Sequence, residues 1–215
     1  MIEFMKRRWY RLLQPRPVDP GPLRPVTLQE GESKVREVLD TAPRLEKILM
    51  ENIVPFWATK TLDEEHGGYL LNHDLAGHLK ASPEKACVPQ SRMIWFFSRL
   101  FREGYLPDAK PAARQGFEFL RSHLWDQAHG GFLWSVSPDG ASVVDGTKRL
   151  YAQTFALYAL AEFALAFDEG EAMELCELGW RAMRDQLRDQ RHGGFHLELD
   201  RDWSPLDPAG PRGKT

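Results

Sequence analysis

The stretch 126-DQAHGGFLW-134 decides how this chain is organised, because it occurs three times. The copies are 63-DEEHGGYLL-71, 126-DQAHGGFLW-134 and 189-DQRHGGFHL-197, and successive copies begin 63 residues apart. Each contains Asp-x-x-His-Gly-Gly followed by an aromatic residue. A turn repeated at a constant interval indicates a repeat architecture, in which each unit packs against its neighbours.

Two kinds of helical pattern alternate between these turns. Apolar residues recur with a 3.6-residue period over 41–60, 108–125 and 170–188, which predicts amphipathic helices. The segments 89–102 and 148–167 are apolar nearly all round, which predicts helices buried on all sides. The alternation favours a two-layer ring with the apolar helices inside and the amphipathic helices outside.

The repeat unit predicted by this order is an outer helix, a glycine turn, a β-hairpin and an inner helix. The hairpin is clearest over 132–144, where Ser-Pro-Asp-Gly separates two short strands. The third unit reaches 210-GPRGKT-215, where an inner helix would begin. We therefore expect an all-α fold, an incomplete half of an α/α toroid over residues 32–215, preceded by a poorly ordered lead-in over 1–31.

Composition excludes several classes of protein. The chain has 215 residues, 42% of them hydrophobic, and a formal net charge of −3, so no basic surface for nucleic acid is expected. We find no apolar run of about 18 residues, which argues against a membrane-spanning helix. Cys87 and Cys176 lack the spacing of a disulfide framework or zinc site, which indicates a reducing, cytoplasmic location.

The repeated histidines His66, His129 and His192 allow two interpretations. Histidine is a common metal ligand and proton carrier, so they could form a site. Alternatively they belong to the turn, in which Gly-Gly permits positive φ. Repetition would place them around a rim, well separated, so the second interpretation is favoured and no metal site is predicted.

Polar residues that open the inner helices are the other candidates. Arg92 lies in the first turn of an apolar helix and is interpreted either as a fixed cation in a polar pocket or as half of a structural ion pair. Lys148, Tyr151 and Gln153 open the second inner helix and either line the same pocket or are satisfied within the core. Taken one at a time, Trp95, Trp125 and Trp134 are better explained by packing than by binding.

Several catalytic arrangements are missing from the sequence. We find no nucleophile elbow, no phosphate-binding glycine loop and no Ser-His-Asp arrangement. No histidine lies in either predicted inner helix, and Glu162 is a lone inward carboxylate, so the carboxylate pair of a hydrolase is not found.

Taken together, the ordered motifs resemble one family. They are Phe-Trp at 56–57, Asp-x-x-x-Gly-Gly at each turn, QSRMIW at 90–95, K-x-x-Y-x-Q-x-FALYALAE at 148–162, and 193-GGFHLELDRDW-203. Over residues 40–215 the chain resembles the N-acylglucosamine 2-epimerase family, which includes cellobiose 2-epimerases and mannose isomerases.

The resemblance implies a barrel of six α/α hairpins with a mono- or disaccharide in its central cavity. It also implies a cofactor-free reaction, in which one histidine removes the proton beside the sugar carbonyl and a second returns a proton to the enediolate. Arg92 matches the family's arginine and would hold the carbonyl oxygen. Tyr151 matches a substrate-contacting tyrosine, and Gln90 and Lys148, in the same motifs, are further expected substrate contacts.

The chain departs from the family pattern in one respect. The family's first proton-transfer histidine lies in an Asn-Thr-His-Leu-His-type segment that would follow Lys214 and Thr215. We therefore expect the 215-residue chain to be the inactive N-terminal half of an epimerase or isomerase. The alternative is a non-catalytic α/α module that binds carbohydrate or another subunit, with self-association through exposed inner helices.

Overall fold

The computed structural model describes residues 28–82 and 84–206. Most of the predicted lead-in, residues 1–27, lies outside the described residues, and residues 28–31 are already helical. The chain divides into two compact units, residues 1–57 and residues 58–215, which we describe separately.

The described part of the first unit is a continuous helical segment. Helix α2 (Leu28–Ile48) leads into a π-helical turn, η1 (Leu49–Ile53), and then into α3 (Val54–Lys60), which crosses into the second unit. The helix predicted over 41–60 is therefore confirmed, and it begins earlier than predicted.

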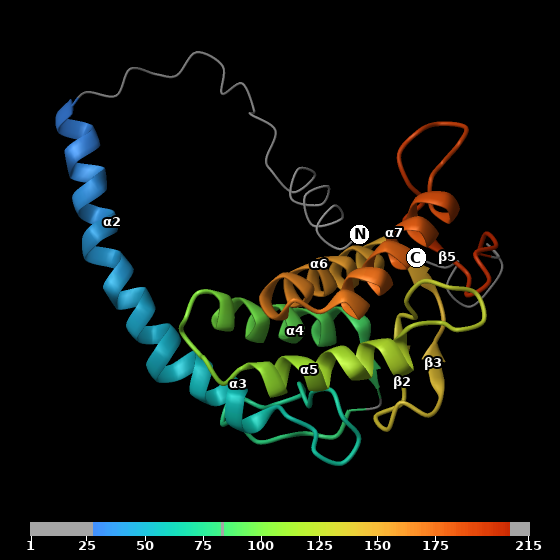
Figure 1. The fold of residues 1–215 in the computed structure, drawn as a ribbon, viewed down its shortest axis with the longest axis horizontal. Helices are drawn as coiled ribbons and strands as arrows, with labels where there is room; N and C mark the ends of the chain where they lie inside the picture. The colour runs from blue at the N-terminus through green and yellow to red at the C-terminus, as the bar shows by residue number, and fades with distance from the viewer. Residues whose placement is uncertain (1–27, 83, 207–215) are drawn as a thin grey trace. The chain divides into compact units, whose positions relative to one another are not determined.

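The second unit has two layers of helices (Figure 1). Helix α4 packs against α6, α5 packs against α4, and α7 packs against α6. The predicted order of outer and inner helices is confirmed. The helices are α4 (Cys87–Arg102), α5 (Lys110–Phe119) with its π-helical end η2 (Leu120–Leu124), α6 (Leu150–Phe167) and α7 (Gly170–Gln186).

Local chemistry explains where these helices begin and end. Pro111 lies in the first turn of α5, where its fixed φ suits a helix and its missing N–H removes no helical hydrogen bond. Gly104, with φ +77°, turns the chain after α4. Asp168 takes the left-handed conformation at the end of α6, with φ 58°.

Short strands connect neighbouring repeats. Strands β2 (Ser135–Val136) and β3 (Val143–Asp145) form the predicted hairpin, and β1 (Lys85–Ala86) pairs antiparallel with β2. Strand β4 (Lys148–Arg149) pairs antiparallel with β5 (Glu198–Leu199). The strand that leads into each inner helix is thus held by the next repeat along the chain.

The expectation that the inner helices are buried on all sides is wrong for one stripe of residues. Tyr151 and Tyr158 on α6 are 57% and 47% exposed. The sequence was also expected to contain no segment apolar enough to span a membrane. Judged by length and composition alone, α6 is such a segment, so that expectation is wrong. More than half of α6 is buried, which is the pattern of a core helix as well.

Each Asp-x-x-His-Gly-Gly stretch forms the same turn. The backbone N–H of the first glycine donates to the aspartate carbonyl, at 2.9 Å for Gly67, 2.8 Å for Gly130 and 3.1 Å for Gly193. Both glycines of every turn have φ between +66° and +76°, which favours glycine over other residues. The predicted glycine conformation is confirmed in all three copies.

Candidate functional site

The exposed stripe of the inner layer combines aromatic rings and one cation. The 63-residue interval also relates the two inner helices: Arg92 on α4 corresponds to Phe155 on α6, and Trp95 corresponds to Tyr158. The Trp95 and Tyr158 rings stack, with centroids 5.1 Å apart, and Tyr151 meets Phe155 edge-on at 4.8 Å. We call Arg92, Trp95, Tyr151, Phe155 and Tyr158 the inner-face cluster.

Arg92 is the exposed cation of this cluster. Its guanidinium carbon lies 5.8 Å from the centre of the Phe155 ring. Among the carboxylates of the described ranges, none forms an ion pair with Arg92, so the structural ion-pair interpretation is not supported there. The arrangement leaves the guanidinium available to an oxygen atom of a ligand on this face.

Glu162 on α6 forms ion pairs with two arginines of α4. Arg102 Nη1 lies 2.8 Å from Glu162 Oε1, and Arg99 Nη1 lies 3.6 Å from the same oxygen. Glu162 thus has two arginine partners, and these bonds add no second carboxylate beside it. Desolvation, and then the charge of Glu162, raise the pKa of Tyr158. Tyr158 is therefore a hydroxyl donor at neutral pH.

The expectation that Gln90 contacts substrate is not supported by its position. Gln90 is 1% exposed, and its side chain spans the backbone of Tyr69. The Tyr69 N–H donates to Gln90 Oε1 at 2.9 Å, and Gln90 Nε2 donates to the Tyr69 carbonyl at 2.8 Å. Gln153 makes the same pair of bonds with Phe132, at 2.8 and 2.7 Å.

Lys148 also has a partner inside the protein. It is 0% exposed, and its Nζ lies 2.9 Å from Asp126 Oδ2. Lys85 makes the equivalent bond to Asp63 at 2.6 Å. We therefore assign structural roles to Gln90 and Lys148, because both side chains are buried and hold the preceding turn by hydrogen bonds.

The paired aspartates remain ionised because several donors surround them. Burial would raise the pKa of Asp126, but hydrogen bonds from Arg201 and then Lys148 outweigh burial and hold its pKa below the usual range. Burial lowers the pKa of Lys148, and the Asp126 carboxylate opposes that change. The ion pair of Asp126 with Lys148 stabilises the turn, because Asp126 also accepts a hydrogen bond from the Ala128 N–H at 3.1 Å.

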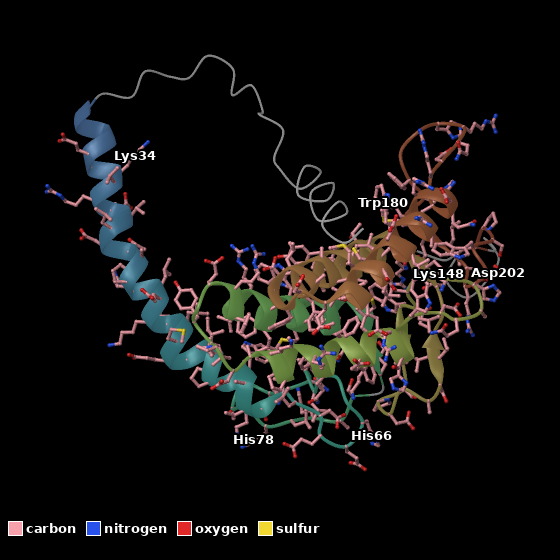
Figure 2. All side chains as sticks on the ribbon, in the orientation of Figure 1. Lys34, His66, His78, Lys148, Trp180 and Asp202 are labelled. Carbon is pink, nitrogen blue, oxygen red and sulfur yellow. The ribbon has the colours of Figure 1, made fainter. Side chains whose placement is uncertain are left out.

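The turn histidines lie away from the inner-face cluster. The His66 N–H donates to Asp63 Oδ1 at 3.0 Å, and the His192 N–H donates to Asp189 Oδ1 at 2.9 Å. Figure 2 shows His66 on a loop outside the helical layers. In the described ranges, no group of three or more His, Cys, Asp or Glu side chains is placed to hold a metal ion. The turn interpretation of these histidines agrees with this geometry.

A pocket of about 690 Å³ is lined mainly by residues that follow the first turn. Its lining does not include Arg92 or Tyr151, so we do not assign it to the inner-face cluster. The residues lining it come from the first repeat and the neighbouring hairpin: Tyr69, Leu70, Leu71, Asn72, Leu79, Lys80, Ala81, Ser82, Glu84, Lys85, Ala86, Pro89, Gln90 and Pro138.

Of the cluster, sequence reasoning found Arg92 and Tyr151 and missed Phe155 and Tyr158. It also assigned Trp95 to packing, and the structure leaves Trp95 half-buried at the edge of the open face. The signal that could have found them is the 63-residue interval, which relates each residue of α4 to a residue of α6 as well as one turn to the next.

Comparison with known proteins identifies the chain's relatives. The family model for N-acylglucosamine 2-epimerase (GlcNAc 2-epimerase) matches residues 67–213. A cellobiose 2-epimerase of Eubacterium cellulosolvens is 36% identical over 165 residues, and one of Dictyoglomus turgidum is 31% identical over 161 residues. These matches cover 75% and 74% of this chain, and 39% and 40% of the relatives.

A solved structure agrees with these matches. Cellobiose 2-epimerase from Spirochaeta thermophila DSM 6192 superposes with a TM-score of 0.72 and 33% identity, over 89% of this chain and 46% of that one. The chain thus spans less than half the length of these relatives, and its fold is part of an α/α toroid. The repeated turns, the two helical layers and these matches together place the chain in the N-acylglucosamine 2-epimerase family.

Proposed function

We propose that the inner-face cluster is one wall of a sugar site in an epimerase or isomerase of this family. The observation that supports the proposal best is Arg92, an exposed cation with no carboxylate partner among the described residues, on a face of aromatic rings. Binding sites for small polar molecules combine apolar and aromatic surface with a few placed polar groups. The match to cellobiose 2-epimerases supports a mono- or disaccharide as the ligand.

The proposed reaction moves a proton beside the sugar carbonyl without a cofactor. A base removes the proton from C2 of the open-chain aldose, and the electron pair of the broken C–H bond forms an enediolate. Return of a proton to the opposite face of C2 gives the epimer, and return to C1 gives the ketose. Negative charge develops on the carbonyl oxygen, where the Arg92 guanidinium would stabilise it.

The residues of this chain supply binding and charge stabilisation in this proposal. All seven histidines lie outside α4 and α6. Cys87 and Cys176 are buried free thiols, and desolvation raises the pKa of each to about 12, so neither is a nucleophile at neutral pH. Free thiols also agree with a cytoplasmic location, which we retain as part of the proposal.

Sugar binding tests the proposal directly. Cellobiose, mannose and N-acetylmannosamine would be titrated into the chain while the indole N–H resonance of Trp95 is followed by NMR. We expect a saturable shift that Arg92→Ala abolishes. The matched control is Arg181→Ala on the outer helix α7, since Arg181 pairs with Glu177 at 2.7 Å and is 58% exposed. A shift that survives Arg92→Ala would contradict the role of the cluster.

Turnover is a separate measurement with its own expected result. The isolated 215-residue chain is expected to convert none of the three sugars, because it offers no described acid–base pair on α4 or α6. Detectable conversion would refute this expectation without affecting the binding result. A non-catalytic module that associates through its inner face remains a second, less favoured candidate. Concentration-dependent sedimentation that a saturating sugar reverses would support it.

A further inference from the structure

The second turn is covered by a tryptophan whose backbone conformation favours glycine. Trp203 has φ 69°, and Gly140, which lies 63 residues before it, has φ +76°. Glycine adopts this left-handed conformation readily, whereas a bulky residue rarely does. Such an outlier indicates that the Trp203 side chain has a use that outweighs the preference of its backbone.

The Trp203 side chain lies on the second turn. Its indole N–H donates to the His129 carbonyl at 2.8 Å. A β-carbon placed on Gly131 would lie 2.5 Å from the ring and 3.1 Å from Gln153 Oε1. The ring and the Gln153 carboxamide therefore pack side by side on the second glycine of the turn. The Lys148 ammonium lies 5.4 Å from the ring centre.

In the first turn, a phenylalanine of the outer helix α5 takes this place. A β-carbon placed on Gly68 would lie 2.8 Å from both the Phe119 ring and Gln90 Oε1. The Lys85 ammonium lies 4.6 Å from the centre of the Phe119 ring. We call Phe119 and Trp203 the covering rings of the first and second turns.

The outer helices α5 and α7 lie alike against the first and second turns. A β-carbon placed on Gly116 of α5 would meet the Tyr69 ring, and one placed on Gly179 of α7 would meet the Phe132 ring. The two glycines are 63 residues apart, as are the two aromatic residues. Positions along α5 and α7 can therefore be compared one to one.

This comparison explains why the second turn uses Trp203. The residue of α7 that corresponds to Phe119 of α5 is Ala182. The methyl group of Ala182 is too short to cover the turn as a phenyl ring does. The Trp203 ring fills that space from the hairpin of the third repeat, so the second turn depends on its neighbouring repeat for its cover.

The groups that Trp203 covers fix the start of α6. Gln153 bonds the backbone of the second turn, and Lys148 bonds the aspartate of that turn. Tyr151 lies between them in sequence and is exposed on the inner face. A helix rotates about 100° per residue, so fixing Gln153 also fixes the direction in which Tyr151 points.

We propose that Trp203 is a positioning residue for Tyr151. Its ring holds Gln153 on the second turn, and this contact sets the direction of Tyr151 on the inner face. The inference deepens the proposed function, on which the role of Tyr151 in sugar binding rests. Loss of the Trp203 ring should affect Tyr151 and leave Arg92 in place, because Phe119 covers the first turn.

The test removes the ring and keeps the backbone. Trp203→Gly suits φ 69°, so a loss in this variant reports the ring and not backbone strain. Two readouts use the chain without sugar: amide hydrogen exchange at Phe132, whose N–H donates to the glutamine of α6, and the NMR shifts of the Tyr151 ring. Exchange at Tyr69 is the internal reference, since its N–H donates to the glutamine of α4 in the same way.

We expect Trp203→Gly to speed exchange of the Phe132 amide by about ten-fold, as the loss of one buried hydrogen bond predicts, without changing exchange at Tyr69. The shifts of the Tyr151 ring should change. Trp203→Phe keeps a ring on the same backbone and should have a smaller effect. Adding Ala182→Phe to Trp203→Gly should restore both readouts, because it supplies a covering ring from the outer helix, as in the first repeat.

Sugar binding supplies the functional readout, followed at the Trp95 indole as above. Trp203→Gly should weaken binding by about five-fold or more, and Ala182→Phe should restore it. A parent chain that binds no sugar would refute the proposed function. The exchange and ring-shift measurements use no sugar, so they decide the role of Trp203 separately.

Three results would overturn the proposal. Equal acceleration of exchange at Phe132 and Tyr69 would show that the whole chain is destabilised. Unchanged Tyr151 shifts, or unchanged sugar affinity, in Trp203→Gly would show that the ring does not position Tyr151. Failure of Ala182→Phe to restore the readouts would show that the two covering rings are not equivalent.

Discussion

Replacing Gln153 by alanine removes both hydrogen bonds that the side chain makes with the Phe132 backbone. Phe132 and Gln153 are each 0% exposed, so water does not reach the freed N–H and C=O groups. Each buried backbone group left without a partner costs about 1–3 kcal/mol. We therefore expect Gln153→Ala to lower the free energy of unfolding by about 2–6 kcal/mol.

The assay is urea unfolding followed by far-UV circular dichroism, with the midpoint and slope compared with those of the parent chain. The matched control is Gln186→Ala at the exposed end of α7, which should change the free energy by less than about 0.5 kcal/mol. Gln90→Ala removes the equivalent bonds of the first repeat and should have an effect of similar size. A loss below about 0.5 kcal/mol for Gln153→Ala would refute the structural role of the glutamine.

Three further predictions concern the turns. Asp126→Asn should destabilise the chain at pH 7 and lose its effect as the pH falls below about 4. Hydrogen bonds from Arg201 and then Lys148 hold the folded-state pKa of Asp126 below its unfolded value. The stabilisation is therefore present above the unfolded pKa and is lost as the pH falls towards the folded one. A constant effect across an acid titration of stability would contradict this. Gly131→Ala should destabilise the chain more than Gly130→Ala in thermal unfolding, although both glycines have φ +71°. The reason is that a β-carbon on Gly131 would lie 2.5 Å from a neighbouring side chain, whereas one on Gly130 would meet nothing within 4 Å. Equal losses of stability would count against this reasoning. Phe195→Ala should change the free energy of unfolding by less than about 1 kcal/mol, since the ring is 40% exposed, and a larger loss by chemical unfolding would show that the third turn is already packed.

The repeat made much of the fold predictable. Asp-x-x-His-Gly-Gly recurs every 63 residues, and the glycines require positive φ wherever they occur. Local patterns were therefore enough to predict the turns, the helices between them and the alternation of these helices into two layers. The hairpin around 137–140 was predictable for the same reason, since Ser-Pro-Asp-Gly favours a turn in any context.

The site was less predictable because the composition of the inner helices does not indicate which side of each helix faces the core. Gln90 and Arg92 are two residues apart on α4, and a helix rotates about 100° per residue, so they lie on nearly opposite faces. The structure buries Gln90 against Tyr69 and exposes Arg92 beside Phe155. From the sequence, both were expected to contact substrate.

The sequence by itself determined the period, the turns and the family of this protein. Only the tertiary structure decided which polar side chains face the open surface and which hold the turns together. The physical reason is that an amphipathic helix such as α5 shows its buried side in its own pattern, whereas α6 is apolar nearly all round and shows none. Its orientation is set by packing against α4 and α7, and by the bonds of Gln153 and Lys148 to the preceding turn.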